Sequence, residues 1–209
     1  MCASYGLGGG SGKPLPADLP PMSDPANLTL LAEWADERKG RAAITGKNAL
    51  NLNPLIHAPE GERRIDLGWW WLWRDPSGPV KYSAFNSRDD KLLRSWKGPF
   101  QHRAILPATW YVEKKVRFSL PDDELFGIAA LTSTVTLADG TQRLSYSMVT
   151  RDAVGEAADT WPRMPLVLPR EMHDEWLDPA RPGDESLVAE ARLASEGISR
   201  DLAGSAPAV

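Results

Sequence analysis

The fold is decided by residues 125–150, LFGIAALTSTVTLADGTQRLSYSMVT. Its two halves, residues 125–137 and 142–150, are rich in the β-branched and apolar residues that favour strands. Between them, Ala138-Asp139-Gly140-Thr141 carries the Asp-Gly pair that is typical of a hairpin turn. The stretch therefore predicts two antiparallel strands and a fold in which sheet supplies most of the core.

The chain around this hairpin adds further short strands. Residues 65–73, IDLGWWWLW, are almost continuously apolar and predict a buried strand. Residues 102–113 predict another, with Pro107 marking an edge or a bulge. Gly, Pro and Ser predict a loop over residues 3–22, and Pro54 predicts an extended loop over 51–54. Shorter extended stretches are expected at 82–86, 116–120 and 165–168, and helical patterns near 23–40, 88–96, 169–177 and 184–202. We therefore expect an α+β fold, predominantly antiparallel β-sheet with peripheral helices.

Length and composition favour one globular domain. The 209 residues are 42% hydrophobic and 25% charged, as in soluble proteins. We expect a domain over 1–180 and a C-terminal helical tail over 181–209, with residues 203–209 disordered. No run of 18 apolar residues suggests a membrane span, and the start lacks a signal-peptide pattern. A single cysteine excludes an internal disulfide, so we expect a cytoplasmic, monomeric protein without a membrane partner.

Charge is unevenly distributed along the chain. The net charge is −4, yet residues 63–117 hold 12 of the 24 Lys and Arg and only 5 of the 28 Asp and Glu. Six of the nine tryptophans also lie in this segment. Basic residues interleaved with aromatic ones suit single-stranded nucleic acid, because cations follow the phosphates and indoles stack on bases.

The first two residues, Met1-Cys2, carry distinctive chemistry. Removal of Met1, which is usual before a small residue, would make Cys2 the N-terminal residue. Its α-amine and thiol would have ordinary pKa values of about 8 and about 8.5. Such a 1,2-aminothiol captures aldehydes: the amine forms a Schiff base, and the thiol closes it into a five-membered thiazolidine.

Other candidate residues are fewer. His57, His102 and His173 lack the spacing of metal ligands, and we expect neither a metal nor a cofactor. Glu113 ends a predicted buried strand, where a carboxylate partly shielded by aromatic side chains can move protons. Asn86 lies in a short extended stretch and could bond a substrate hydroxyl or orient an amine.

The order of several short motifs resembles that of the SOS response-associated peptidase (SRAP) family. The family patterns are M-C-G-R, N-V-A-P, W-G-(x)n-W, I-N-A-R, a P-A-D-G-F-Y-E-W type strand and H-D-R-M-P-V-I-L. The corresponding segments cover residues 1 to about 180 and are Met1-Cys2, Asn51-Leu52-Asn53-Pro54, 68–73, Phe85-Asn86-Ser87-Arg88, 101–105, 107–113 and 163–168.

The resemblance implies a barrel-like fold and binding of single-stranded DNA at abasic sites. In the family, the mature N-terminal cysteine forms a thiazolidine with the ring-opened sugar, which protects the lesion from strand cleavage. The same cysteine is credited with removing the preceding residue. Carried over to this sequence, Cys2 is the nucleophile, Asn86 positions the amine and the sugar, and Glu113 is the acid/base.

The same resemblance implies contacts with DNA. Arg88 and Arg163 match residues that hold phosphates. The residues that match segments wedged against neighbouring bases are Asn53, Pro54, Trp69, Trp70 and Trp71.

One departure from the family pattern affects the chemistry. The family histidine that helps to open the sugar and to reverse the crosslink falls on Trp161, and an indole transfers no proton. Two alternatives therefore stay open. One is a non-covalent single-stranded DNA-binding module with decayed chemistry, and the other is a thiol peptidase that acts on other proteins.

Overall fold

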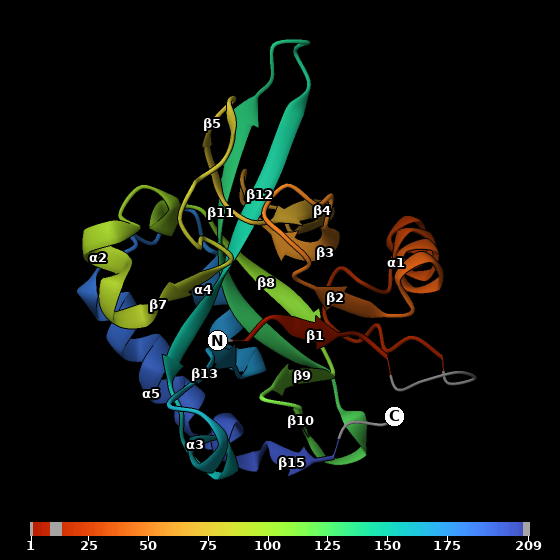
Figure 1. Ribbon diagram of the computed structural model, residues 1–209, viewed down its shortest axis with the longest axis vertical. Helices are drawn as coiled ribbons and strands as arrows, with labels where there is room; N and C mark the ends of the chain where they lie inside the picture. Colours follow the sequence, from red (N-terminus) through yellow and green to blue (C-terminus); the bar gives the residue numbers. More distant parts are fainter. Residues whose placement is uncertain (1, 9–13, 207–209) are drawn as a thin grey trace.

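The computed structural model describes residues 2–8 and 14–206 (Figure 1). Met1 and the last residues, 207–209, lie outside the described part, so the expectations about them stay predictions. The strands are β1 Ser4–Gly6, β2 Arg41–Ala43, β3 Leu52–His57, β4 Arg64–Trp70, β5 Trp73–Asp75, β6 Gly78–Pro79, β7 Asn86–Arg88, β8 Arg103–Ala108, β9 Trp110–Glu113, β10 Val116–Ser119, β11 Phe126–Thr136, β12 Gln142–Asp152, β13 Arg163–Pro165, β14 Val167–Leu168 and β15 Ala203–Ser205. The α-helices are α1 Pro25–Arg38, α2 Leu92–Ser95, α3 Glu156–Thr160, α4 His173–Leu177 and α5 Glu185–Asp201.

Five strands close into a barrel. In the eight-stranded sheet, β12, β4, β3, β8 and β11 follow one another, and β11 also pairs with β12. Within this ring only the pairing of β12 with β4 is parallel. The predicted α+β class, with mostly antiparallel sheet and a barrel-like core, is confirmed.

The β11–β12 hairpin forms as the sequence predicts. The two strands pair from Ala130 opposite Met148 to Thr136 opposite Gln142. In the turn, the Asp139 carboxylate accepts bonds from the Thr141 backbone N–H at 2.9 Å and hydroxyl at 2.7 Å. Gly140 has a φ of 84°, a conformation that glycine adopts without steric cost.

A second sheet holds both ends of the described chain, in the order β15-β10-β9-β1-β2. The loop predicted over residues 3–22 is therefore wrong for β1, which is buried and paired on both sides, with β2 and with β9. Disorder predicted from residue 203 is also wrong for β15, which pairs with β10. In both places pairing with distant strands outweighs a local composition rich in small residues.

Two other strand boundaries differ from the prediction. Residues 102–113 are not one strand, because Thr109 separates β8 in the barrel from β9 in the second sheet. The predicted loop over 51–54 is wrong for Leu52–Pro54, which belong to β3. Pro107 fits an edge-like position: β11 pairs with it, whereas β3 pairs with β8 only at Ala104 and Ile105.

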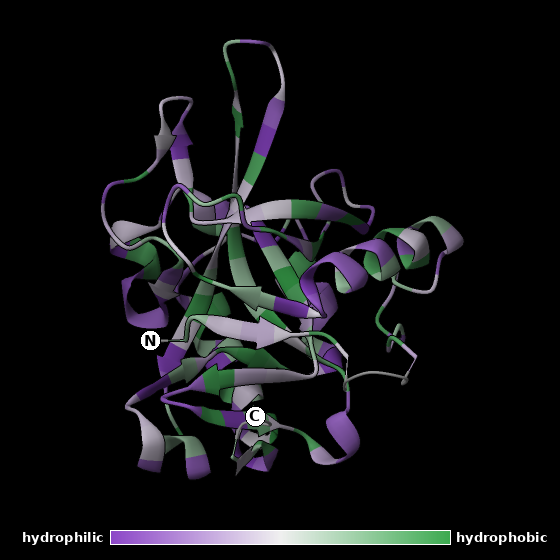
Figure 2. Cartoon of the chain, turned by 45° about the vertical axis from the view of Figure 1, so that its right-hand side comes forward, coloured by the Kyte–Doolittle hydropathy of each residue, from purple (hydrophilic) through white to green (hydrophobic). Residues whose placement is uncertain are grey.

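The helices lie around the periphery of the strands (Figure 1). Figure 2 shows the hydrophobic residues concentrated on the central strands and the hydrophilic ones toward outer helices and loops. The expected C-terminal helix forms as α5, where the Asp184 side chain accepts a bond from the Leu187 N–H. Among the residues described, no helix combines the length and apolarity needed to cross a membrane. A domain boundary at residue 180 stays a prediction.

Candidate functional site

Cys2 lies immediately before β1, where the chain enters the second sheet. Its side chain is 1% exposed, and the thiol donates to the Ser4 carbonyl at 3.4 Å. Burial raises the pKa of the Cys2 thiol to about 12, and the nearby negative charge of Glu113 adds to the rise. The thiol is therefore protonated near neutral pH.

Asn86 reaches Cys2 from the barrel. It is the first residue of β7, which runs parallel to β12 with Asn86 opposite Met148. Its side-chain Nδ2 donates to the Cys2 backbone carbonyl at 2.7 Å, and both residues are buried. This bond fixes the position of the backbone at the start of the chain relative to the barrel.

Glu113 completes the cluster from the second sheet. It ends β9, whose register places Val112 opposite Ser4, so the next residue lies beside the chain just before β1. The carboxylate is buried, and its charge acts on the Cys2 thiol. The structure thus brings together Cys2, Asn86 and Glu113, which stand far apart in the sequence.

Tyrosines around this cluster were not singled out from the sequence. Tyr111 lies two residues before Glu113, on the same face of β9. Burial, and then the charges of Cys2 and Glu113, raise its pKa well above the ordinary value. The hydroxyls of Tyr5 and Tyr146 share a bond at 2.7 Å. Alternation along β9 could have indicated Tyr111, whereas the Tyr5–Tyr146 contact joins strands that the sequence does not pair.

The residues predicted to wedge against bases lie mostly inside the protein. Asn53 and Pro54 are buried in β3, and the Asn53 amide donates to the Tyr146 hydroxyl at 3.1 Å. Trp70 stacks on Tyr146 and donates its N–H to the Phe85 carbonyl. Trp69 and Trp71, which flank Trp70, are also buried; the Trp71 N–H donates to the Val80 carbonyl. Their contacts in the structure are with the protein, and a role on DNA stays a prediction.

The two arginines predicted to hold phosphates differ in environment. Arg88 is exposed and pairs with its neighbour Asp90 at 2.8 Å. Arg163 is mostly buried, and its guanidinium contacts Asp89 at 2.7 Å and Asp152 at 2.6 Å. Of the two, Arg88 is the more accessible to a DNA phosphate.

Trp161, which the resemblance aligns with the family histidine, lies just before β13 and is partly exposed. The Lys114 ammonium is 4.2 Å from the centroid of its ring. Lys114 directly follows Glu113, so this cation–π pair lies at the end of the strand that carries the carboxylate. Within the described part of the chain, no group of three or more His, Cys, Asp or Glu could hold a metal ion.

Comparison with known proteins identifies one family and a shared fold. The profile of the family described as SOS response associated peptidase (SRAP) matches residues 31–200. That range includes Asn86 and Glu113 and begins after Cys2. Among curated protein sequences, none matches this chain.

Solved structures from two bacteria share the fold. A protein from Bacteroides thetaiotaomicron superposes with a TM-score of 0.65 at 15% identity, covering 97% of this chain and 90% of its own. A protein from Bordetella bronchiseptica gives 0.61 at 18% identity, with 100% of both chains covered. A phage-related protein from the same organism gives 0.58 at 18% identity, covering 98% of this chain and 93% of its own.

Proposed function

This chain belongs to the SOS response associated peptidase (SRAP) family, and from its geometry at Cys2 we propose that it captures abasic sites in single-stranded DNA as a covalent thiazolidine. The observation that carries the proposal is the 2.7 Å bond from the Asn86 amide to the Cys2 carbonyl. That bond fixes the N-terminal residue beside a buried carboxylate, Glu113. Fixing the reacting groups in this way lowers the entropic part of a reaction barrier.

The protonation of Cys2 sets the order of the steps. Burial raises the pKa of the Cys2 thiol, so the sulfur is a weaker nucleophile near neutral pH than an exposed thiol would be. A free α-amine, with an ordinary pKa of about 8, is neutral in a useful fraction of molecules. The amine attacks the sugar aldehyde first and releases one water as the imine forms. The S–H bond then adds across the C=N bond, so that sulfur joins carbon and the proton reaches nitrogen.

Glu113 is the acid/base in this scheme. The sugar must first open from its cyclic form to the aldehyde. In this step the hemiacetal hydroxyl loses a proton and the ring oxygen gains one. The carboxylate then relays the thiol proton to the nitrogen as the ring closes. Asn86 acts by position, since it holds the carbonyl of the reacting residue and not the sulfur.

The raised thiol pKa makes a peptidase acting on other proteins the weaker alternative. A cysteine nucleophile that attacks amides needs thiolate character, which comes from nearby positive charge. At Cys2 burial, the largest effect, and the charge of Glu113 raise the thiol pKa, and they outweigh the lowering by backbone hydrogen bonds and by the positive N-terminus. Non-covalent DNA binding remains the second candidate, favoured by Trp161, because its indole cannot take the histidine's part in proton transfer.

A denaturing gel tests the proposal directly. The mature protein is incubated with a single-stranded oligonucleotide that carries one abasic site, beside the same oligonucleotide without the lesion. We expect a heat-stable, lesion-dependent band, formed more slowly by Glu113→Gln and Asn86→Ala. No band from protein whose Met1 is shown by mass spectrometry to be absent would rule out covalent capture and leave non-covalent binding.

Cys2→Ser is the matched control. It keeps the terminal amine but replaces the sulfur, so it can form the imine without the stable ring. We expect its product to survive heating only after borohydride reduction. A heat-stable band without reduction would show that the linkage is not a thiazolidine.

A further inference from the structure

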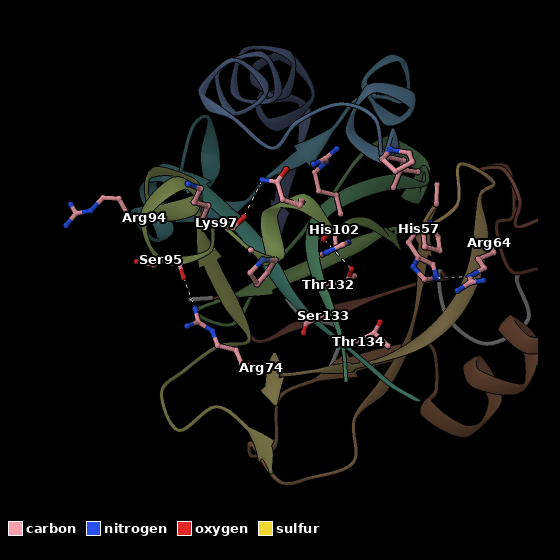
Figure 3. A pocket seen from close by; sticks show the side chains of 18 residues that line it. His57, Arg64, Arg74, Arg94, Ser95, Lys97, His102, Thr132, Ser133 and Thr134 are labelled. Atoms are coloured by element: carbon pink, nitrogen blue, oxygen red, sulfur yellow. Dashed lines mark hydrogen bonds between the residues drawn. The ribbon is translucent and has the colours of Figure 1, made fainter. Parts of the chain in front are cut away.

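A second site lies apart from Cys2, at the end of the barrel where β3 ends and β8 begins. Here lies a cavity of about 810 Å³, which we call the basic groove. Five cationic side chains line it: Arg64, Arg74, Arg94, Lys97 and Arg103. Figure 3 shows Arg74, Arg94 and Lys97 on one side, Arg64 on the other, and Thr132 to Thr134 between them. Neither Cys2, Asn86 nor Glu113 lines this cavity.

The charge of the basic groove is largely uncompensated. No Asp or Glu is among the described residues that line it. Arg64 pairs with Asp66 at 2.9 Å. Within the described chain, Arg94 and Lys97 make no ion pair, and both are exposed. Such a concentration of one sign in a concave surface attracts a polyanion.

Arg103 adds a buried positive charge beneath the groove. Its guanidinium donates to the backbone carbonyls of Phe100, Trp176, Asp178 and Arg181. These neutral acceptors hold the side chain in place, and the charges of Asp178, Asp184 and Glu175 act on it from outside the groove lining. The sequence excess of Lys and Arg over residues 63–117 is thus gathered by the fold, with all five cations of the groove drawn from that segment.

An exposed aromatic ring, that of Tyr82, lies beside Arg74 and outside the groove lining. The Arg74 guanidinium is 5.8 Å from the centroid of Tyr82 and 6.0 Å from that of Trp96. Trp96 is buried, whereas Tyr82 is 49% exposed. An exposed ring beside uncompensated cations is the combination that binds a single strand, with phosphates on the cations and a base on the ring.

We propose that the basic groove binds the phosphodiester backbone of single-stranded DNA, with a base stacked on Tyr82, as a contact separate from the Cys2 site. The choice of DNA rests on the proposed function, since the groove alone specifies a flexible polyanion with aromatic bases. The contact needs no lesion, because it acts on phosphates and on a base, which an undamaged strand also carries. It holds a strand non-covalently, whether or not Cys2 has reacted.

Charge reversal tests the groove. Arg94→Glu/Lys97→Glu is compared with Lys39→Glu/Lys47→Glu, a pair outside the groove lining with the same charge change. Binding of a fluorescent, lesion-free oligonucleotide is followed by anisotropy over a series of salt concentrations. We expect the groove pair to lose about tenfold in affinity or more. The slope of log affinity against log salt concentration, the salt slope, should fall by about 1.4, because each phosphate of a single strand that the protein no longer neutralises removes about 0.7. The control pair should keep the slope of the unmodified protein.

Tyr82→Ala separates stacking from charge. It should weaken binding about fivefold or more while leaving the salt slope unchanged, because it removes a base contact and no phosphate contact. Equal losses from the groove pair and the control pair would overturn the proposal, and so would unchanged binding by the groove pair. A loss confined to duplex DNA would also overturn it, since the site would then not be one for a single strand.

The same variants distinguish this proposal from covalent capture. At saturating abasic oligonucleotide, Arg94→Glu/Lys97→Glu should still crosslink to completion. If the groove proposal fails, Arg94→Glu/Lys97→Glu still crosslinks to the abasic oligonucleotide and binds the lesion-free oligonucleotide as tightly as the unmodified protein does. If covalent capture fails, lesion-free binding still depends on Arg94 and Lys97.

Discussion

Arg163→Ala should act chiefly on stability. The Asp89 side chain is 1% exposed and that of Arg163 11%, with 2.7 Å between Nη2 and Oδ1. Removing one partner of a buried ion pair typically costs about 3–5 kcal/mol. Arg192 remains 3.0 Å from the other Asp89 oxygen, so we expect the lower end, about 3 kcal/mol. At about 2–4 °C per kcal/mol, the melting temperature should fall by roughly 6–12 °C, as measured by calorimetry and urea unfolding.

Arg88→Ala is the matched control, because the resemblance assigns both arginines to phosphates. Among the described residues Arg88 forms its ion pair with the exposed Asp90, so its loss should cost at most about 1 kcal/mol of stability. Adding Asp89→Asn to Arg163→Ala should recover part of the loss, since it removes a buried carboxylate charge that Arg192 alone would then compensate. If Arg163→Ala instead keeps full stability while losing affinity for DNA, our assignment of Arg163 to a structural ion pair is refuted.

Three buried positions give the remaining predictions. Glu113→Gln should speed alkylation of Cys2 near pH 8, because a negative neighbour that raises the thiol pKa is lost; slower alkylation would contradict this. Gly127→Ala should cost about 1–3 kcal/mol in urea unfolding, because its Cβ would lie 2.7 Å from both His173 and Ile105; unchanged stability would contradict the tight packing. Burial lowers the pKa of His173, so its contribution to stability is complete above about pH 6.5 and falls as pH decreases below that value; His173→Gln should flatten this acid slope, and an unchanged slope would exclude the histidine as its source.

Local pattern was enough to predict the parts of the fold that pair with near neighbours. The β11–β12 hairpin joins adjacent segments through a turn whose Asp-Gly chemistry is visible in the sequence. The parallel pairing of β12 with β4, which closes the barrel, could not be read in that way. It joins segments far apart in the chain, and no local residue preference specifies such a partner. β1 shows the same limit, because its strand form depends on β2 and β9.

The candidate site was predictable through chemistry and resemblance, but its geometry was not. Cys2 stood out because a lone cysteine after Met1 has a specific reactivity. Nothing in the sequence indicated that Asn86 would bind the carbonyl of Cys2, since that contact depends on β7 docking against β12. The tryptophan run suggested base stacking, yet Trp70 packs against Tyr5 and Tyr146. A large apolar surface is stabilised most by burial, and the barrel interior provides it.

For the proposed function, the position of β1 between β9 and β2 limits how a lesion would meet Cys2. Cys2 is two residues from the first paired residue, Ser4, and a chain advances at most about 3.6 Å per residue. The terminus can therefore move over only about 7 Å, far less than a mobile tail that searches the solvent for an aldehyde. In the proposed capture the protein is thus the stationary partner and the nucleic acid does the moving: the damaged sugar would have to turn out of its strand to meet the amine of Cys2.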